Sequence, residues 1–246
     1  MTTLFSNNTV PQRIFRRAEL PVADYLMSYA DDLRKEFLDG QDLETVALKQ
    51  DNTFSSNTPN AVVDYLVKIE KNGSYVSDPS GWKNKQIKYT DLNNIVHHEP
   101  NDSLKQRYPT ACKLIEEYGN DCHSARYSLL GPRSSIGRHT DPDDRLGLFV
   151  KIHIPLIVPN GDVFFEVFGE EIDWSDIFAF NNQLCHSAYN NTDEWRLCFI
   201  LDIKRTRIGI PPGAPYDVKL ELEAEPFIRN GKQLTFGVMP ELDKFL

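Results

Sequence analysis

The amino-acid sequence predicts a mainly β protein, built as a barrel or sandwich of short strands with helices before it. Three observations predict this class. Residues 148–158 and 196–203 alternate in polarity with the period of two that a half-buried strand requires. Turn signals rich in Pro, Gly and Asn separate the short apolar runs. A chain of 246 residues also falls within the size range of single all-β barrels.

Two helices are expected before the strands. The first spans residues 21–39, where Pro21 suits a first turn, apolar residues recur at helical spacing, and Gly40 suits the C-terminal cap. The second spans residues 103–118, and Pro109 is placed to divide it into two pieces. Both helices are expected to pack on the outside of a sheet.

The region between the two helices, residues 41–101, favours short strands joined by loops. A single tryptophan, Trp82, is interpreted as a core or loop-anchoring residue rather than part of a substrate site. Adjacent residues on a strand face opposite ways, so His97 and His98 cannot easily reach one metal ion. We interpret both histidines as ordinary polar residues.

The strand core is expected to begin with residues 125–130, which place the hydroxyl of Ser128 on the inward face. The segment 133–139 is expected to be a loop. Its two arginines, Arg133 and Arg138, are interpreted as solvated surface charges in preference to contacts with a substrate carboxylate.

Alternation within residues 148–158 places Lys151 and His153 on one face and aliphatic side chains on the other. A buried lysine is costly without an anion, and a bound dicarboxylate would provide one. A lysine at an exposed sheet edge is the alternative. The turn signal Pro159–Asp162 is expected to join this strand to residues 162–169 as a hairpin.

Three further strands are expected. Residues 176–181 form one, and residues 183–189 form the next and carry His186. In the last, residues 196–203, Arg196 lies on the face opposite a continuous aliphatic stripe. His186 and Arg196 therefore lie on strands that are far in sequence from the first strand of the core.

The segment His139-Thr140-Asp141 has the spacing of a metal site. A histidine and a carboxylate two residues apart on an extended backbone point to the same side. His186, at 186 − 139 = 47 residues further on, is a plausible third ligand. Two imidazoles and one carboxylate leave open positions on the ion, as in non-haem Fe(II) oxygenases. Arg196 follows ten residues after His186, and its planar fork suits a dicarboxylate such as 2-oxoglutarate.

From about Tyr127 to Ile203 the sequence resembles the aspartyl/asparaginyl β-hydroxylase family of 2-oxoglutarate-dependent oxygenases. The matching segments are YSLLGPRSSIGRHTDP, FVKIHIPLIVP and DIFAFNNQLCHSAYNNTDEWRLCFILDI. The resemblance implies that His139 and His186 bind iron. It also implies the residues that hold the cosubstrate, which are Ser128, Lys151, His153 and Arg196.

Two positions depart from the family pattern. The founding members have glycine where this chain has Asp141, so a complete set of His139, Asp141 and His186 is expected to bind the metal here. The family's arginine is replaced by Lys151, a point charge rather than a fork.

The resemblance also implies the topology and the chemistry. We expect a double-stranded β-helix (jelly roll, cupin-like) at residues 123–204, after a flanking helical and mixed region at 1–122 and before a C-terminal extension at 205–246. The expected cofactors are Fe(II), 2-oxoglutarate and O2. The expected reaction hydroxylates an unactivated C–H bond of an amino acid, a peptidyl residue or a related small molecule, and yields succinate and CO2.

Two alternatives stay open from the residues alone. One is a non-catalytic cupin-type binding module, and the other is a cupin-type metal-dependent hydrolase or isomerase. The substrate is not determined.

Composition excludes several classes of partner. The chain carries 27 Lys and Arg against 36 Asp and Glu, a net charge of −9, whereas nucleic acids and anionic membranes favour basic surfaces. The first 20 residues lack the apolar core of a signal peptide, and no run approaches the roughly 18 apolar residues of a membrane span. The four cysteines form no C-x-x-C pair and are expected to be free thiols. We therefore expect a cytoplasmic protein without a nucleic-acid or membrane partner. The extension could add strands, cover the barrel or make a homo-oligomer.

Overall fold

The structure is a computed structural model of the 246-residue chain. The structure describes residues 14–40, 64–66, 82–90, 94–132, 134–139, 148–182, 184–211, 228–229 and 232–233.

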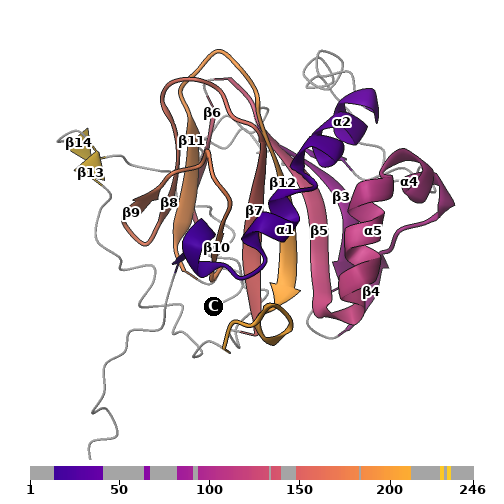
Figure 1. Ribbon diagram of the computed structural model, residues 1–246. Coiled ribbons are helices and arrows are strands. Elements are labelled where there is room, and N and C mark those ends of the chain that lie inside the picture. Colours follow the sequence, from indigo (N-terminus) through magenta and orange to yellow (C-terminus); the bar gives the residue numbers. More distant parts are fainter. Residues whose placement is uncertain are drawn as a thin grey trace, which may run out of the picture.

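Two antiparallel sheets form the body of the protein (Figure 1). The larger has the order β1-β10-β7-β12-β5-β3-β2, with β4 paired to β3, and the smaller has the order β6-β11-β8-β9. The strands of the larger sheet are β1 (Ile14–Arg16), β2 (Asp64–Leu66), β3 (Trp82–Thr90), β4 (Val96–His98), β5 (Cys122–Leu130), β7 (Phe149–Ile157), β10 (Phe178–Phe180) and β12 (Arg196–Lys204). Those of the smaller sheet are β6 (Ser134–His139), β8 (Val163–Val167), β9 (Glu170–Ile172) and β11 (His186–Asn190).

Eight consecutive strands, β5 to β12, make a double-stranded β-helix. Strands β5, β12, β7 and β10 are neighbours in the larger sheet, and β6, β11, β8 and β9 are neighbours in the smaller one. The chain crosses repeatedly from one sheet to the other, and every pairing within these eight strands is antiparallel. This is the two-Greek-key connectivity of a jelly roll, so the predicted fold class is confirmed.

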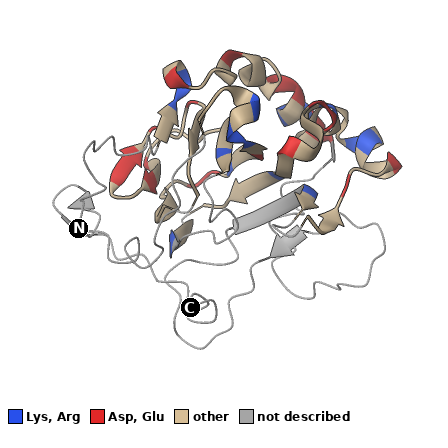
Figure 2. Cartoon of the chain, turned by 90° about the horizontal axis from the view of Figure 1, so that it is seen from below, with Lys and Arg blue, Asp and Glu red and all other residues tan. Residues whose placement is uncertain are grey.

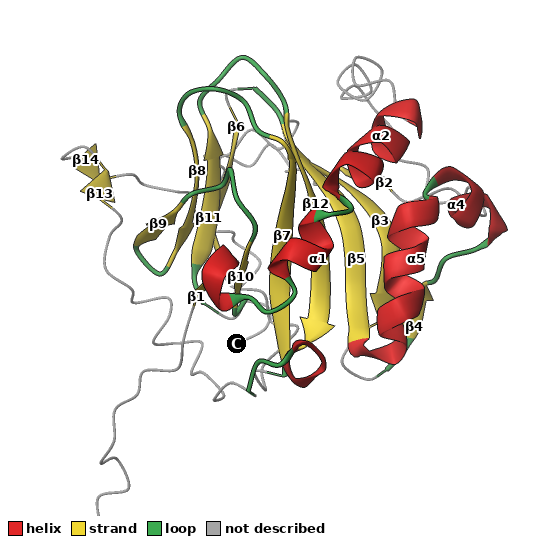
Figure 3. Cartoon of the chain, in the orientation of Figure 1, coloured by secondary structure: helices red, strands yellow, loops and turns green. Residues whose placement is uncertain are grey.

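The helices cover the outer face of the larger sheet (Figures 1 and 3). They are α1 (Ala23–Met27), α2 (Ala30–Gly40), α4 (Asp102–Arg107) and α5 (Pro109–Tyr118), with short 3-10 turns η1 (Arg17–Glu19), η3 (Gly119–Asp121) and η5 (Arg205–Ile208). Pro109 begins α5 and divides the second helical stretch, as its position predicted.

The predicted single helix over residues 21–39 is wrong, because the chain is interrupted between α1 and α2. Ser28 is the C-cap of α1, and its hydroxyl donates to the carbonyl of Tyr25 at 2.6 Å. This local side-chain bond competes with continuation of the helix. None of the described helices is both long and apolar enough to cross a membrane.

Two predictions about strands need correction. The turn Pro159–Asp162 does not close a hairpin, since β7 lies in the larger sheet and β8 in the smaller. A turn signal specifies a reversal of the chain but not which sheet receives it. Strand β8 instead pairs with β9 across Phe168 and Gly169, whose φ angles of 50° and 82° suit a tight hairpin turn. The predicted loop at 133–139 contains strand β6, which is held by its pairing with β11 rather than by β propensity.

The larger sheet separates two apolar clusters. One lies between this sheet and the helices, and the aliphatic faces of β7 and β12 belong to it, with Ile152, Ile154 and Leu201 fully buried. The other lies between the two sheets and is rich in aromatic side chains. The face of β7 and β12 that is not aliphatic therefore points into the barrel.

A buried carboxylate joins the helices to the barrel. Glu36 of α2 accepts hydrogen bonds from the backbone amides of Thr110 (2.7 Å) and Ala111 (2.9 Å) in the first turn of α5. It also accepts one from the hydroxyl of Tyr127 on β5 at 2.5 Å. Glu36 thus satisfies amides that the helix itself leaves without acceptors.

Of the C-terminal extension the structure describes residues 205–211, which contain η5, and a short hairpin of β13 (Ile228–Arg229) and β14 (Lys232–Gln233). The role of the extension stays a prediction. The side chain of Trp82 and all of Arg133 lie outside the described residues. Among the described elements, basic and acidic residues are interspersed, with acidic side chains together on β9 (Figure 2).

Candidate active site

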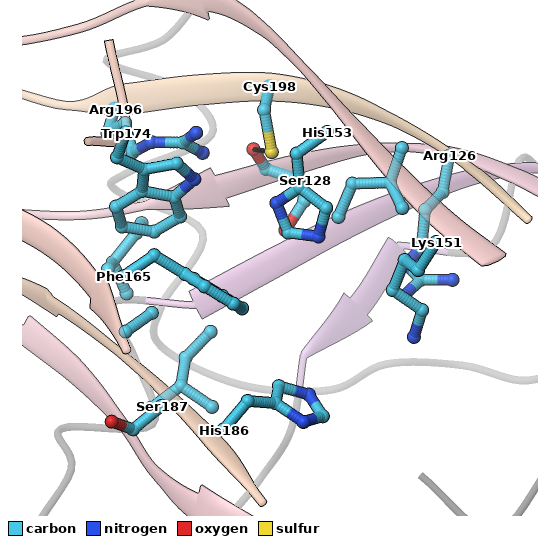
Figure 4. A pocket seen from close by; sticks show the side chains of 14 residues that line it. Arg126, Ser128, Lys151, His153, Phe165, Trp174, His186, Ser187, Arg196 and Cys198 are labelled. Carbon is cyan, nitrogen blue, oxygen red and sulfur yellow. Dashed lines mark hydrogen bonds between the residues drawn. The ribbon is translucent and has the colours of Figure 1, made fainter. Parts of the chain in front are cut away.

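A cavity of about 60 Å³ lies between the two sheets, inside the barrel (Figure 4). The larger sheet contributes Arg126, Ser128, Leu130, Lys151, His153, Arg196, Cys198 and Ile200. The smaller sheet contributes Ile136, Phe165, His186, Ser187 and Ala188, and the segment between β9 and β10 contributes Trp174.

All five predicted site residues with described side chains line this cavity: Ser128, Lys151, His153, His186 and Arg196. The strands of the first three and of Arg196 lie side by side in the larger sheet, since Cys198 of β12 pairs with Ser128 on β5 and Ile200 with His153 on β7, whereas His186 comes from β11 of the smaller sheet. The predicted alternation of β7 and β12 is therefore confirmed. Lys151 is 4% exposed and faces the cavity, so the alternative of a lysine at an exposed edge is wrong.

Arg196 is a buried cation with unused donors. It is 1% exposed, and its Nε and Nη2 atoms have no hydrogen-bond partner among the described residues. Its Cζ atom lies 3.3 Å from the centroid of the Trp174 ring, a stacked cation–π contact. Burial lowers the pKa of Arg196 to about 10, so the guanidinium is charged at neutral pH. A buried charge of this kind calls for an anionic ligand.

His153 is buried as a neutral imidazole. Burial, followed by the charges of Arg196 and Lys151, holds its pKa well below the usual value. Neither ring nitrogen has a hydrogen-bond partner among the described residues, and Phe165 and Phe178 pack against the ring with centroids at 5.0 and 4.9 Å. A neutral imidazole keeps one N–H donor for a ligand in the cavity.

Three basic side chains line the cavity. Arg126, Lys151 and Arg196 are lining residues, and no aspartate or glutamate is among those described. Arg126 has an acidic partner on the neighbouring strand β12, because its Nη1 lies 3.7 Å from Oδ2 of Asp202. The described charged side chains that line the cavity are therefore all basic. Such a lining suits a ligand with two negative charges.

The ring of His186 is buried and oriented by the backbone. It is 4% exposed, and its Nδ1 lies 2.8 Å from the carbonyl oxygen of Leu184. A carbonyl can only accept, so Nδ1 carries the hydrogen and Nε2 keeps its lone pair. A histidine that donates from one nitrogen to a carbonyl is oriented to ligate through the other.

The backbone register brings the second predicted histidine to the same place. His139 at the end of β6 lies directly opposite His186 on β11. The side chain of His139 and the whole of Asp141 lie outside the described residues. Within the described part of the chain, no group of three or more His, Cys, Asp or Glu side chains could hold a metal ion.

The interpretation of Arg138 as a solvated charge is wrong. Its Nη2 and Nε donate to the two carboxylate oxygens of Glu166 at 2.6 and 3.1 Å, and Glu166 is fully buried. Ser187 donates to the same carboxylate at 2.8 Å, and the amide of Gly169 is a further donor. Since Arg138 precedes His139 and Ser187 follows His186, this network ties together the strands that carry both histidines.

A β-bulge accompanies the network. Between the pairs His186–His139 and Ala188–Ile136, two residues of β6 stand opposite Ser187 alone. Bulges of this kind re-aim side chains beside functional sites. Sequence reasoning missed Glu166, although its position between the inward-facing Phe165 and Val167 could have indicated an outward-facing carboxylate. It also missed Trp174, for which the sequence offers no signal.

Comparison with known proteins gives one family match. A family model described as aspartyl/asparaginyl beta-hydroxylase matches residues 31–206. No curated protein matches the sequence significantly.

Several solved structures share part of the fold at low similarity. A 2OG-Fe(II) oxygenase family oxidoreductase from Burkholderia pseudomallei is 12% identical, with 55% of this chain and 71% of that chain covered and a TM-score of 0.36. A predicted oxalate decarboxylase from Thermotoga maritima is 22% identical, with 37% of this chain and 73% of that chain covered and a TM-score of 0.29. A cupin domain of a transcriptional regulator from Enterobacter cloacae is 13% identical, with 32% and 79% covered and a TM-score of 0.27. Similarity at this level carries no argument about function.

Proposed function

Because the chain belongs to the aspartyl/asparaginyl β-hydroxylase family, we propose that it is an Fe(II)- and 2-oxoglutarate-dependent dioxygenase. Its substrate would be an amino acid, a peptidyl residue or a related small molecule with an unactivated C–H bond. The observation that carries the proposal is Arg196, a fully buried guanidinium with unused donors at the wall of a cationic cavity.

The cavity fits 2-oxoglutarate by the chemistry of its donors. Arg196 would bind the carboxylate remote from the metal, because its planar fork matches a carboxylate in two bonds. Ser128 lies on the neighbouring strand β5 and would add its hydroxyl to the same group. Lys151 and the neutral His153 would complete the binding of the dianion from β7.

His139, Asp141 and His186 would hold the iron. When bound, Fe(II) supplies the activation of O2 that couples oxidative decarboxylation of 2-oxoglutarate, to succinate and CO2, with hydroxylation of the substrate. The part of His186 is to present Nε2, fixed by its bond to Leu184. The aromatic wall of Phe165, Phe178 and Phe180 keeps the interior of the barrel apolar and excludes water.

The proposal is tested by succinate formation from 2-oxoglutarate and by anaerobic calorimetry with Fe(II). We expect iron-dependent and O2-dependent succinate formation, abolished in His186→Ala and requiring far more 2-oxoglutarate in Arg196→Met. The matched control is Arg205→Met, since Arg205 is also buried but does not line the cavity.

Three outcomes would overturn the proposal. Full affinity for 2-oxoglutarate in Arg196→Met would remove that residue from the site. A lack of any metal or 2-oxoglutarate binding would favour a non-catalytic cupin-type module. Turnover of a substrate with zinc or manganese in the absence of O2 would favour a hydrolase or isomerase.

A further inference from the structure

Trp174 occupies a fixed position beside the buried arginine. It lies in the segment between β9 and β10, where Asp173 accepts bonds from the amide (2.9 Å) and the hydroxyl (2.6 Å) of Ser175. This side-chain turn holds the backbone at Trp174. The indole is 4% exposed and packs against Phe165, with ring centroids 5.3 Å apart. The ring is therefore held between the aromatic cluster on one side and the guanidinium of Arg196 on the other.

The polar edge of this indole is unsatisfied. Trp174 Nε1 is buried and has no hydrogen-bond partner among the described residues. Buried tryptophans usually find a partner for this N–H, because leaving it unpaired costs free energy. In Figure 4 the indole nitrogen and the two terminal guanidinium nitrogens of Arg196 lie on the same side of the stacked pair, toward Ser128. Two buried residues thus direct unused donors into one space.

From this arrangement we propose that Trp174 is a carboxylate-binding residue, whose indole N–H donates to the same cosubstrate carboxylate as Arg196 and Ser128. The inference rests on the proposed function and adds to it a donor from outside the barrel strands. The indole would have two separate roles. Its face fixes the plane of the guanidinium, and its edge supplies one further hydrogen bond.

The simpler explanation is that Trp174 is only a packing residue of the inner cluster. That explanation accounts for the stacking and the burial, but not for an indole donor left unpaired beside a guanidinium that also has unpaired donors. The two explanations predict different ligand affinities for a variant that keeps an aromatic ring against Arg196 but lacks the N–H. Trp174→Phe is such a variant.

The experiment compares two ligands in two proteins. Binding of 2-oxoglutarate and of 2-oxobutyrate is measured anaerobically with Fe(II), because 2-oxobutyrate has the same 2-oxo acid group but no second carboxylate. A hydrogen bond to a charged group contributes enough to change an affinity by about tenfold to a hundredfold. We expect Trp174→Phe to lose that much affinity for 2-oxoglutarate and none for 2-oxobutyrate. The control Trp195→Phe, whose ring packs against the cluster on the helix side, should bind both ligands as the wild type does.

Equal affinity of the wild type and Trp174→Phe for 2-oxoglutarate would overturn the inference while leaving the proposed function intact. An equal loss for both ligands would also overturn it, since general disturbance of the site would then explain the result. If the wild type binds neither ligand, the proposed function fails first, and the inference with it.

A second measurement is made on the wild-type protein. In the wild-type protein loaded with Zn(II), the indole N–H resonance of Trp174 is followed by NMR, and Trp174→Phe serves only to assign it. We expect a downfield shift with 2-oxoglutarate and little change with 2-oxobutyrate. An unmoved resonance at saturating 2-oxoglutarate would show that the N–H does not meet the carboxylate.

Discussion

Replacing Arg196 by methionine should stabilise the ligand-free protein while removing its affinity for 2-oxoglutarate. Burial lowers the pKa of Arg196 to about 10, well below that of a free guanidinium. At about 1.4 kcal/mol for each pH unit, a depression of this size corresponds to roughly 3 kcal/mol of destabilisation when the group is charged. Because Arg196 is 1% exposed, solvent screening does not reduce this figure.

The sign follows from proton linkage. The unfolded chain keeps the arginine proton more readily than the folded one, so the folded state bears the full cost at every pH below about 10. The cost declines only as the pH rises from there toward the pKa of the free group. At neutral pH the methionine variant is therefore relieved of it.

Loss of the stack on Trp174 offsets part of the gain. A desolvated cation–π contact contributes up to about 2 kcal/mol. We expect a net stabilisation of about 1 to 2 kcal/mol, in the range found when buried charges are replaced by apolar side chains of similar volume. For a chain of this length that is a rise in Tm of a few degrees.

The assay is thermal and urea unfolding of both proteins, with and without 2-oxoglutarate and Mn(II) in place of iron. Ligand at 100 times its Kd should stabilise the wild type by about 2.7 kcal/mol and the variant hardly at all. The control Arg205→Met should keep the stabilisation by ligand. A ligand-free Arg196→Met protein that is several kcal/mol less stable than the wild type would refute the reasoning, because the guanidinium would then have a structural partner.

Four further predictions test other parts of the account. Asp141→Gly should weaken Fe(II) binding by at least about tenfold in calorimetry, the lower end of what changes around metal sites cost; wild-type affinity would show that the carboxylate is incidental. Glu166→Gln should lower the metal affinity by a similar factor, because Arg138 then loses its ionic partner beside His139, and an unchanged affinity would make the network purely structural. Glu36→Ala should cost about 2 to 4 kcal/mol in urea unfolding, since three donors lose their acceptor, with 2-oxoglutarate affinity unaffected. Because the pKa of His153 is held well below the ordinary value, the imidazole stays neutral, and we expect no contribution of His153 to the pH dependence of 2-oxoglutarate affinity between about pH 6 and 8. A pH dependence in this range that is present in the wild type and absent in His153→Gln would contradict this.

The inward-facing residues of the site could be predicted because a strand with one buried aliphatic face has only one other face. Lys151 and His153 on β7, and Arg196 on β12, share that other face, and the barrel encloses it. The pairing of His139 with His186 was less accessible, because it depends on β6 and β11 becoming neighbours across 47 residues of chain. Local spacing cannot specify such a pairing, and the family resemblance supplied it.

The errors also have physical causes. The hairpin expected at Pro159–Asp162 failed because local turn chemistry does not determine which sheet the next strand joins. Arg138 was misjudged because its partner Glu166 is 28 residues away, on a strand that becomes its neighbour only through β11. Trp174 was missed because a single tryptophan in a turn has no periodicity. In each case the missing information was a tertiary contact.

The most direct test of the central claim is the visible charge-transfer absorption of an Fe(II)–2-oxo acid chelate, recorded anaerobically on the purified protein. The account predicts a band that needs both Fe(II) and 2-oxoglutarate and saturates at one iron per chain. It should be lost in His186→Ala and should require far more 2-oxoglutarate in Arg196→Met. A protein that gives no such band, binds no metal in calorimetry and forms succinate equally well in the presence of a chelator would contradict the account.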